Sequence, residues 1–283
     1  MRRLALRLVG LVAVGFVIAL GGSALAGQKP QVLRMHGPDV RPVHRRSKPQ
    51  RATPLIDHGG LLLPQPNIHA IYWGPSANFP TDLQTGLDDF FSDFAPTDYS
   101  GILTQYLGSS VGLLTINDSF DTSTPPGRGP SASTIVNEAC KVVAQAGASP
   151  DPNGIYFVFT SNFPHVSYCG YHAWGSCTAN GSSATIQVAY IPNPANVSGC
   201  TLPKFFATSD GYSLATESVA NITAHELAET ITDPQGTGWF DKNGQEIGDK
   251  CAWMFANAVA LSEGTTWQLQ ELWSNSANAC VQD

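Results

Sequence analysis

Residues Gly154–Thr160 read GIYFVFT, the clearest signal for a buried strand in this 283-residue chain. The run is rich in β-branched and aromatic residues, which fit a pleated surface inside a core. Similar runs, NIHAIYW at Asn67–Trp73 and TIQVAYI at 185–191, predict two further strands. Apolar residues recur at helical spacing, which predicts helices, in residues 81–94, 133–146 and 216–232.

Weaker patterns predict smaller elements around these segments. They are a short helix at 102–107, a strand at 112–116, a turn-rich loop at 119–130, a Cys/Gly/His-rich stretch at 165–180 and a last strand at 267–273. Strands and helices mix without strict β–α–β alternation. The predicted fold class is therefore α+β (mixed α/β), with a central sheet and flanking helices.

Charge is divided unevenly along the chain. Residues 1–55 carry ten Lys/Arg and one acid, a net charge of +9, whereas residues 56–283 carry five Lys/Arg and 21 Asp/Glu, a net charge of −16. Only the second segment is long enough to bury a core, so we predict a single globular domain over 56–283. A domain this acidic is a poor candidate for binding nucleic acid, which relies on clustered Lys/Arg.

The first 26 residues have the features of a signal peptide. Three arginines precede an apolar run at 8–20, and an Ala-x-Ala cleavage pattern follows at 24–26. The alternative, an uncleaved anchor, is disfavoured because the run is shorter than the ~20 residues that span a bilayer. We expect a secreted protein with no stable membrane insertion. The basic, Pro-rich residues 27–55 predict a flexible linker or pro-segment, or a segment that docks on an acidic surface such as the chain's own domain.

Six cysteines follow the signal segment, and no Cys-x-x-Cys pair suggests thiolate zinc. An even number of cysteines in an exported chain predicts up to three disulfides. The preferred pairings are Cys177–Cys200, across a Gly/Ser/Asn-rich loop, and Cys251–Cys280, which would tie down the C-terminus. Both are hypotheses, because spacing alone does not fix connectivity.

The chemistry centres on His225-Glu226-Leu227-Ala228-Glu229, inside the predicted helix 216–232. Residues four apart share a helix face, so His225 and Glu229 could ligate one metal ion. Glu226 lies about 100° round the helix from His225, where it could act as general base on a metal-bound water. The pattern is that of the His-Glu-x-x-His zinc peptidases, with Glu in place of the second His.

A catalytic zinc site usually has three protein ligands, so a third ligand is needed. Glu246 and Asp249 are candidates, 17 and 20 residues beyond the second motif carboxylate. Asp249 could instead orient His225. His172 is a further candidate, as a ligand or as a hydrogen-bond donor in the transition state. An acidic calcium loop at 241–249 is the alternative for the two carboxylates, which keeps Ca²⁺ as a minor option beside Zn²⁺.

Two other interpretations compete with a metal site. The first is a solvated helix face, but apolar residues around the motif indicate a largely buried helix, where unpartnered ionisable groups are costly. The second is a Ser-His-Asp hydrolase, which is disfavoured because no Ser of the chain stands out as a nucleophile.

Taken in order, several motifs resemble those of the phosphate-induced, EXORDIUM-like family of secreted plant cell-wall proteins with bacterial relatives. The resemblance covers most of residues 58–283 and is strongest at 224–229 and at Glu-Ile-Gly-Asp-Lys-Cys, 246–251. It also includes IHAIYWG at 68–74 and Cys-Gly-Tyr-His at 169–172. The resemblance implies a secreted protein linked in plants to growth and brassinosteroid responses, without an established reaction. The plant pattern has a further Cys before the Cys-Gly-x-His element, so its disulfide pairing is not carried over.

The leading hypothesis from the sequence is an exported zinc-dependent hydrolase, with a metallopeptidase as the favoured class and a peptide or cell-wall substrate. The alternative is a non-catalytic extracellular protein that binds cell-wall polysaccharide or a partner, with a structural acidic or calcium site. Zinc content and the effect of Glu226→Gln on hydrolysis separate the two hypotheses.

Overall fold

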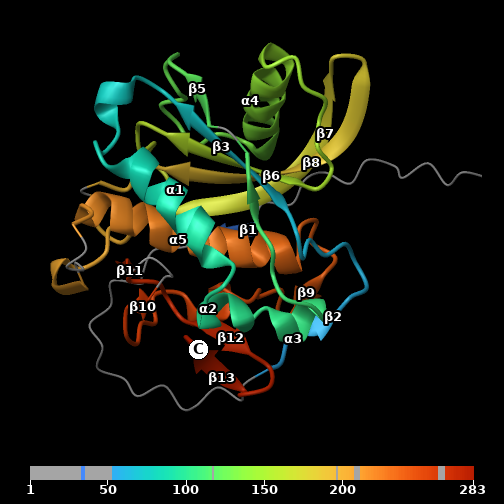
Figure 1. Cartoon of the computed structure of the whole chain (residues 1–283), viewed down its shortest axis with the longest axis vertical. Coiled ribbons are helices and arrows are strands. Elements are labelled where there is room, and N and C mark those ends of the chain that lie inside the picture. The colour runs from blue at the N-terminus through green and yellow to red at the C-terminus, as the bar shows by residue number, and fades with distance from the viewer. Residues whose placement is uncertain (1–32, 36–52, 117, 196, 207–210, 261–264) are drawn as a thin grey trace, which may run out of the picture.

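A seven-stranded mixed sheet forms the centre of the protein (Figure 1). Its strands are β1 (Leu33–Met35), β3 (Asn67–Trp73), β4 (Leu114–Thr115), β5 (Ser119–Asp121), β6 (Gly154–Thr160), β7 (Gly170–Ala179) and β8 (Ser182–Pro192). They lie in the order β1-β7-β8-β6-β3-β4, and β5 also pairs with β3. The pairs among β3, β4, β5, β6 and β8 are parallel, whereas β7 and β1 extend the sheet in the antiparallel sense.

The structure, a computed structural model, describes residues 33–35, 53–116, 118–195, 197–206, 211–260 and 265–283. The signal peptide predicted at 1–26 lies outside the described residues. So does most of the linker predicted at 27–55, of which 33–35 and 53–55 are described.

Helices cover both faces of the sheet, as Figure 1 shows. They include α1 (Leu83–Phe94), α4 (Ala132–Gln145) and α5 (Leu214–Thr232). α4 packs on one face over β6, β7 and β8, and α5 packs on the other face together with α1. Each face has its own hydrophobic core. The predicted α+β class, a mixed central sheet with flanking helices, is confirmed.

α5 is buried on all sides because it lies between the sheet and the C-terminal part of the chain. One side contacts β7 and β8, and Trp267, Leu269 and Leu272 belong to the apolar core around the helix. This surrounding explains why the helix carries no simple polar face. Its first turn is capped by Ser213, whose hydroxyl accepts the N–H of Thr216.

Short elements complete the fold. The short helices are α2 (Asp98–Gly101) and α3 (Thr104–Leu107), and the 3₁₀ turns are η1 (Ser76–Asn78), η2 (Lys204–Phe206) and η3 (Asp249–Cys251). The two-stranded sheets are β2 (Ile56–Asp57) with β9 (Trp239–Phe240), β10 (Val259–Ala260) with β11 (Thr266–Trp267), and β12 (Leu272–Ser274) with β13 (Ala279–Val281).

Three predicted segments differ from the structure. The strand predicted at 267–273 is divided between β11 and β12, because residues 268–271 turn towards α5 and bond its polar side chains. The loop predicted at 119–130 begins with β5, and the Cys/Gly/His-rich stretch at 165–180 contains the whole of β7. Small residues suit β7 because helices pack closely on it: a Cβ at Gly175 would lie 3.0 Å from Val136 of α4.

Three disulfides join Cys140 to Cys177, Cys169 to Cys200, and Cys251 to Cys280. The Cys251–Cys280 prediction is confirmed, and the Cys177–Cys200 prediction is wrong. Cys177 packs in the core under α4, whereas Cys200 packs in the core on the other face of the sheet. Three disulfides fit an extracellular protein. Among the described residues, no helix is long and apolar enough to cross a membrane.

The Cys140–Cys177 disulfide links α4 to β7 on the face opposite α5, and the two cysteines are 37 positions apart in the sequence. Replacing both cysteines with Ser is expected to lower the free energy of unfolding by about 2–4 kcal/mol, chiefly because the unfolded chain gains freedom. Urea unfolding checks the loss. Metal content should stay unchanged, and a loss of metal would show that this disulfide also positions the cluster described below.

Candidate metal centre

All six residues that the sequence singled out converge beside α5. The helix contributes three of them, β7 contributes one, and the segment that leads into η3 contributes two: His225, Glu226, Glu229; His172; Glu246 and Asp249. Five of the side chains are fully buried, and Asp249 is 24% exposed. The structure therefore brings together groups separated by up to 77 residues (249 − 172) in the chain.

His225 and Glu229 lie side by side, as their spacing of four predicts. His225 Nε2 is 3.1 Å from Glu229 Oε1 and 3.9 Å from Asp249 Oδ1. Although the first contact is short, its geometry is not that of a hydrogen bond, so Nε2 has no hydrogen-bond partner. The ligand atoms of His225, Glu229 and Asp249 all lie within 4.8 Å of one another, close enough to surround a single ion. Of the two carboxylates that are candidates for third ligand, Asp249 is the one that joins this pair.

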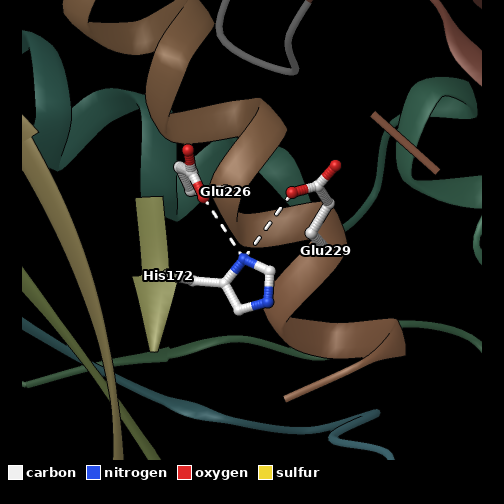
Figure 2. A group of neighbouring side chains, drawn as sticks. All are labelled: His172, Glu226 and Glu229. Atoms are coloured by element: carbon white, nitrogen blue, oxygen red, sulfur yellow. Dashed lines mark hydrogen bonds and ion pairs between the residues drawn. The ribbon is translucent and has the colours of Figure 1, made fainter. Parts of the chain in front are cut away.

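His172 occupies the other side of the cluster, and Figure 2 shows its ring facing two carboxylates of α5. His172 Nδ1 lies 3.3 Å from Glu226 Oε2 and 3.6 Å from Glu229 Oε2. Its Nε2 is 3.7 Å from Glu246 Oε1. Glu246 is therefore next to His172 rather than next to His225. The ring belongs to β7, a regular strand that the sequence did not predict within the stretch 165–180, and the strand fixes the direction of the ring.

Two glycines make room for the cluster. A Cβ at Gly170, on β7, would lie 2.9 Å from Glu226 Oε1. A Cβ at Gly248 would lie 2.7 Å from His225 Nδ1. In both places the backbone packs directly against a functional side chain, so glycine is required by close approach.

Gln270 is a member of the cluster that the sequence did not reveal. Its Nε2 donates to Gly248 O at 3.0 Å and lies 2.9 Å from His225 Nδ1, and its Oε1 accepts from Trp253 N at 3.3 Å. The side chain thus orients the His225 ring. If His225 Nε2 ligates a metal, Nδ1 carries the proton, so the Gln270 amide must turn over to accept it. No short motif links residues 225 and 270, so the sequence contains no signal for this contact.

The cluster holds four carboxylates, and among the described residues no Lys or Arg pairs with them. Burial raises the pKa of Glu226, and burial together with repulsion from Glu229 raises the pKa of Glu246 well above its usual value and that of Asp249 to about 7. Burial opposes ionisation of Glu229 too, but His225 and His172 lower its pKa to about 2.

The pKa values of the two histidines reflect the same excess of buried carboxylates. Burial alone would lower their pKa values, but the facing carboxylates raise the pKa of His225 to about 9 and that of His172 well above its usual value. Without another cation, the two rings must supply the positive charge that the carboxylates need. A bound divalent ion would take that role and release the protons.

Unpartnered ligand atoms support the same conclusion. Buried atoms without a hydrogen-bond partner include His172 Nε2, His225 Nε2, Glu226 Oε1, Glu229 Oε2 and both Glu246 oxygens. Two sets have ligand atoms that all lie within 4.8 Å of one another: His172, Glu226 and Glu229, and His225, Glu229 and Asp249. Both sets can therefore hold a metal ion, and they share Glu229.

Nitrogen donors in each set suit zinc better than calcium, which prefers oxygen ligands alone. The predicted calcium alternative used the loop that begins at Asp241. There Asp241 accepts hydrogen bonds from Thr53, Lys250 and two backbone N–H groups. Its oxygens are satisfied by the protein, and they lie outside both ligand sets.

No family model matches the chain, and no curated protein matches it either. The resemblance to EXORDIUM-like proteins therefore stays a prediction.

A separate carboxylate pair, which the sequence did not reveal, lies where α4 faces β5. Lys141 Nζ is 3.0 Å from Glu138 Oε2 and also bonds Asp121. Burial and the hydrogen bond to Asp121 raise the pKa of Glu138 to about 7, against the opposing effect of Lys141. Burial alone would raise the pKa of Asp121, but hydrogen bonds from Lys141, Glu138 and Ser123 lower it. At neutral pH the two carboxylates therefore share a proton.

This pair predicts a pH dependence of stability. Between the ordinary Glu pKa of 4.5 and about 7, the folded protein keeps a proton on Glu138 that the unfolded chain releases. The free energy of unfolding should therefore fall as the pH rises through this window. Glu138→Gln is expected to flatten that part of the profile. Urea unfolding at a series of pH values measures it, and an unchanged slope in the variant would contradict the shared proton.

Proposed function

We propose that the protein is an exported zinc-dependent hydrolase, with His225, Glu229 and Asp249 as the metal ligands. The observation that carries the proposal is the buried cluster itself, in which ligand atoms lack partners and, among the described residues, no Lys or Arg pairs with the four carboxylates. Such a cluster is stable only if it holds protons or a cation.

The set with His225 is preferred to the set with His172 for two reasons. Asp249 is 24% exposed, so this side of the cluster is the one that solvent reaches. In addition, a metal in this set leaves Glu226 free, whereas the other set would use it as a ligand. A zinc ion bound there would polarise a substrate carbonyl and lower the pKa of a water ligand to about 7.

Glu226 is then the general base. Its raised pKa suits a group that must take and return a proton near neutral pH. Glu226 Oε2 is held by His172 Nδ1 at 3.3 Å, while Oε1 is unpartnered and available. His172 is in turn flanked by Glu246, 3.7 Å from its Nε2. In this series, His172 and Glu246 orient Glu226, and they can take up charge when Glu226 is protonated.

A peptide is the proposed substrate class. The His-Glu-x-x-Glu helix differs from the zinc-peptidase motif only in its last residue, and a carboxylate is an accepted zinc ligand. Membership of the EXORDIUM-like family is proposed on the same motif and on the Glu-Ile-Gly-Asp-Lys-Cys run at 246–251. That family supplies no reaction, so the chemistry rests on the cluster alone.

The burial of five of the six groups favours a second candidate. Structural zinc sites are closed to solvent, whereas catalytic sites keep an open position. In this second candidate the metal stabilises a non-catalytic extracellular protein that binds a wall polysaccharide or a partner.

Hydrolysis of a quenched fluorescent peptide library separates the two candidates. The assay compares metal-free protein with zinc-loaded protein. It uses both the wild type and a Leu33→Pro/Arg34→Pro variant, in which the two prolines prevent β1 from pairing with β7. We expect cleavage that a chelator removes and that added zinc restores. Zinc binding and chelator-induced unfolding without cleavage by either protein would support the structural candidate and contradict the hydrolase.

A further inference from the structure

One strand of the central sheet does not come from the globular domain. β1 belongs to the basic segment 27–55, and it pairs antiparallel with β7 in the register Leu33↔His172, Arg34↔Tyr171 and Met35↔Gly170. β1 also contacts α5, the helix that carries the His-Glu-x-x-Glu motif. β1 therefore lies beside the strand and the helix that carry the candidate metal centre.

The paired residues of β7 are the ones that touch the centre. His172 bonds Glu226, and Gly170 has its Cα so close to Glu226 that a Cβ would lie 2.9 Å from Oε1. β1 thus covers the backbone edge of β7 along the three residues beside the proposed general base. His172 and Glu226 are fully buried in this arrangement.

Without β1, β7 would be the edge of the sheet, since its other side pairs with β8. An edge strand presents free backbone N–H and C=O groups, which bind an extended peptide by adding a strand. Main-chain hydrogen bonds supply the affinity, so the edge accepts more than one sequence.

Charge favours the basic segment as the occupant. Residues 27–55 contain seven Lys/Arg and one Asp, whereas residues 56–283 carry a net charge of −16. Opposite charges attract the segment to the domain. Because the segment is tethered, its effective concentration at the edge is high.

We propose that the edge of β7 at Gly170–His172 is a docking site for an extended peptide, and that Leu33–Met35 occupies and blocks it in the full chain. Docking itself depends only on the sheet edge. Its consequence rests on the proposed hydrolase: displacement of β1 admits a peptide substrate next to Glu226, so the basic segment acts as an inhibitor.

A double proline substitution tests the docking. In an antiparallel pair, successive residues alternate between bonding towards the partner and bonding away from it. Leu33→Pro/Arg34→Pro therefore removes at least one N–H that faces β7, whichever residue donates it. Leu33→Ala/Arg34→Ala is the matched control, because it removes the same side chains and keeps both N–H groups. Thermal unfolding establishes that both variants are folded.

The readout is binding of a fluorescein-labelled peptide with the sequence of residues 29–38, measured by anisotropy. The proline variant should bind the peptide at least tenfold more tightly than the wild type or the alanine variant, and a peptide with the two prolines should not bind. Equal binding by the three proteins, or no binding by the proline variant, would overturn the docking site.

Two further measurements, hydrogen exchange and peptide hydrolysis, complete the test. Hydrogen exchange on the wild-type protein should show protection at the Gly170–His172 amides that face β1, and exchange as fast as in an open edge would overturn the proposal even if the variant failed to fold. Hydrolysis of the peptide library is measured in parallel. If the peptide binds as expected but cleavage does not rise, the docking site stands and the hydrolase is the part that fails.

Discussion

Glu226→Gln is expected to slow hydrolysis strongly while the zinc stays bound. The amide cannot accept a proton, so the loss should be about 10²–10⁴-fold, the usual contribution of a general base. Glu226 is not among His225, Glu229 and Asp249, the residues proposed to hold the metal, so zinc content should remain at one ion per chain. The rate of peptide cleavage and elemental analysis on the same sample give both numbers.

Glu138→Gln is the matched control for this variant. It makes the same substitution in a buried carboxylate on α4, across the sheet from the cluster. Its cleavage rate should equal that of the wild type. If Glu226→Gln retains full activity, Glu226 is not the base and the proposed chemistry is wrong.

Glu229→Gln is expected to lose the zinc itself. The two oxygens of Glu229 face the two histidines, with Oε1 3.1 Å from His225 Nε2 and Oε2 3.6 Å from His172 Nδ1. Glu229 is also the carboxylate whose pKa the histidines lower to about 2, so it carries its charge at any physiological pH. Replacing it removes the fixed charge that the ion needs.

Affinity for zinc should fall by at least roughly a hundredfold, more than the loss typical of residues that only orient ligands. Competition with a chromophoric chelator measures it. Glu226→Gln serves as the comparison, since it neutralises a carboxylate three residues away on the same helix. Equal losses in the two variants would mean that the metal occupies the set with His172, which includes both carboxylates.

The helix and its ligands were predictable because local spacing determines them. Positions four apart meet on any α-helix, so the contact of His225 with Glu229 follows from the sequence once the helix is accepted. The choice between Glu246 and Asp249 does not follow in the same way. Both precede or begin η3, and only the packing of that turn places Asp249 beside His225 and Glu246 beside His172.

Contacts across the sheet were less accessible to sequence reasoning. The wrong Cys177–Cys200 pairing treated the region as one loop, whereas Cys177, within β7, lies on the α4 face and Cys169, just before β7, lies in the core on the other face. No strand was predicted in the Cys/Gly/His-rich stretch at 165–180, where glycine, a residue depleted in strands, recurs. In the structure those small residues allow α4 and α5 to approach the strand. Tertiary packing therefore overrides local preference at the strand that borders the site.

X-ray absorption at the zinc edge of the purified, zinc-loaded protein tests the central claim most directly. We expect one zinc per chain with only nitrogen and oxygen ligands, at about 2.0–2.2 Å. His225→Ala should remove that signal in a protein that remains folded. Failure of the wild-type protein to retain zinc, or an unchanged zinc environment in His225→Ala, would contradict the metal centre.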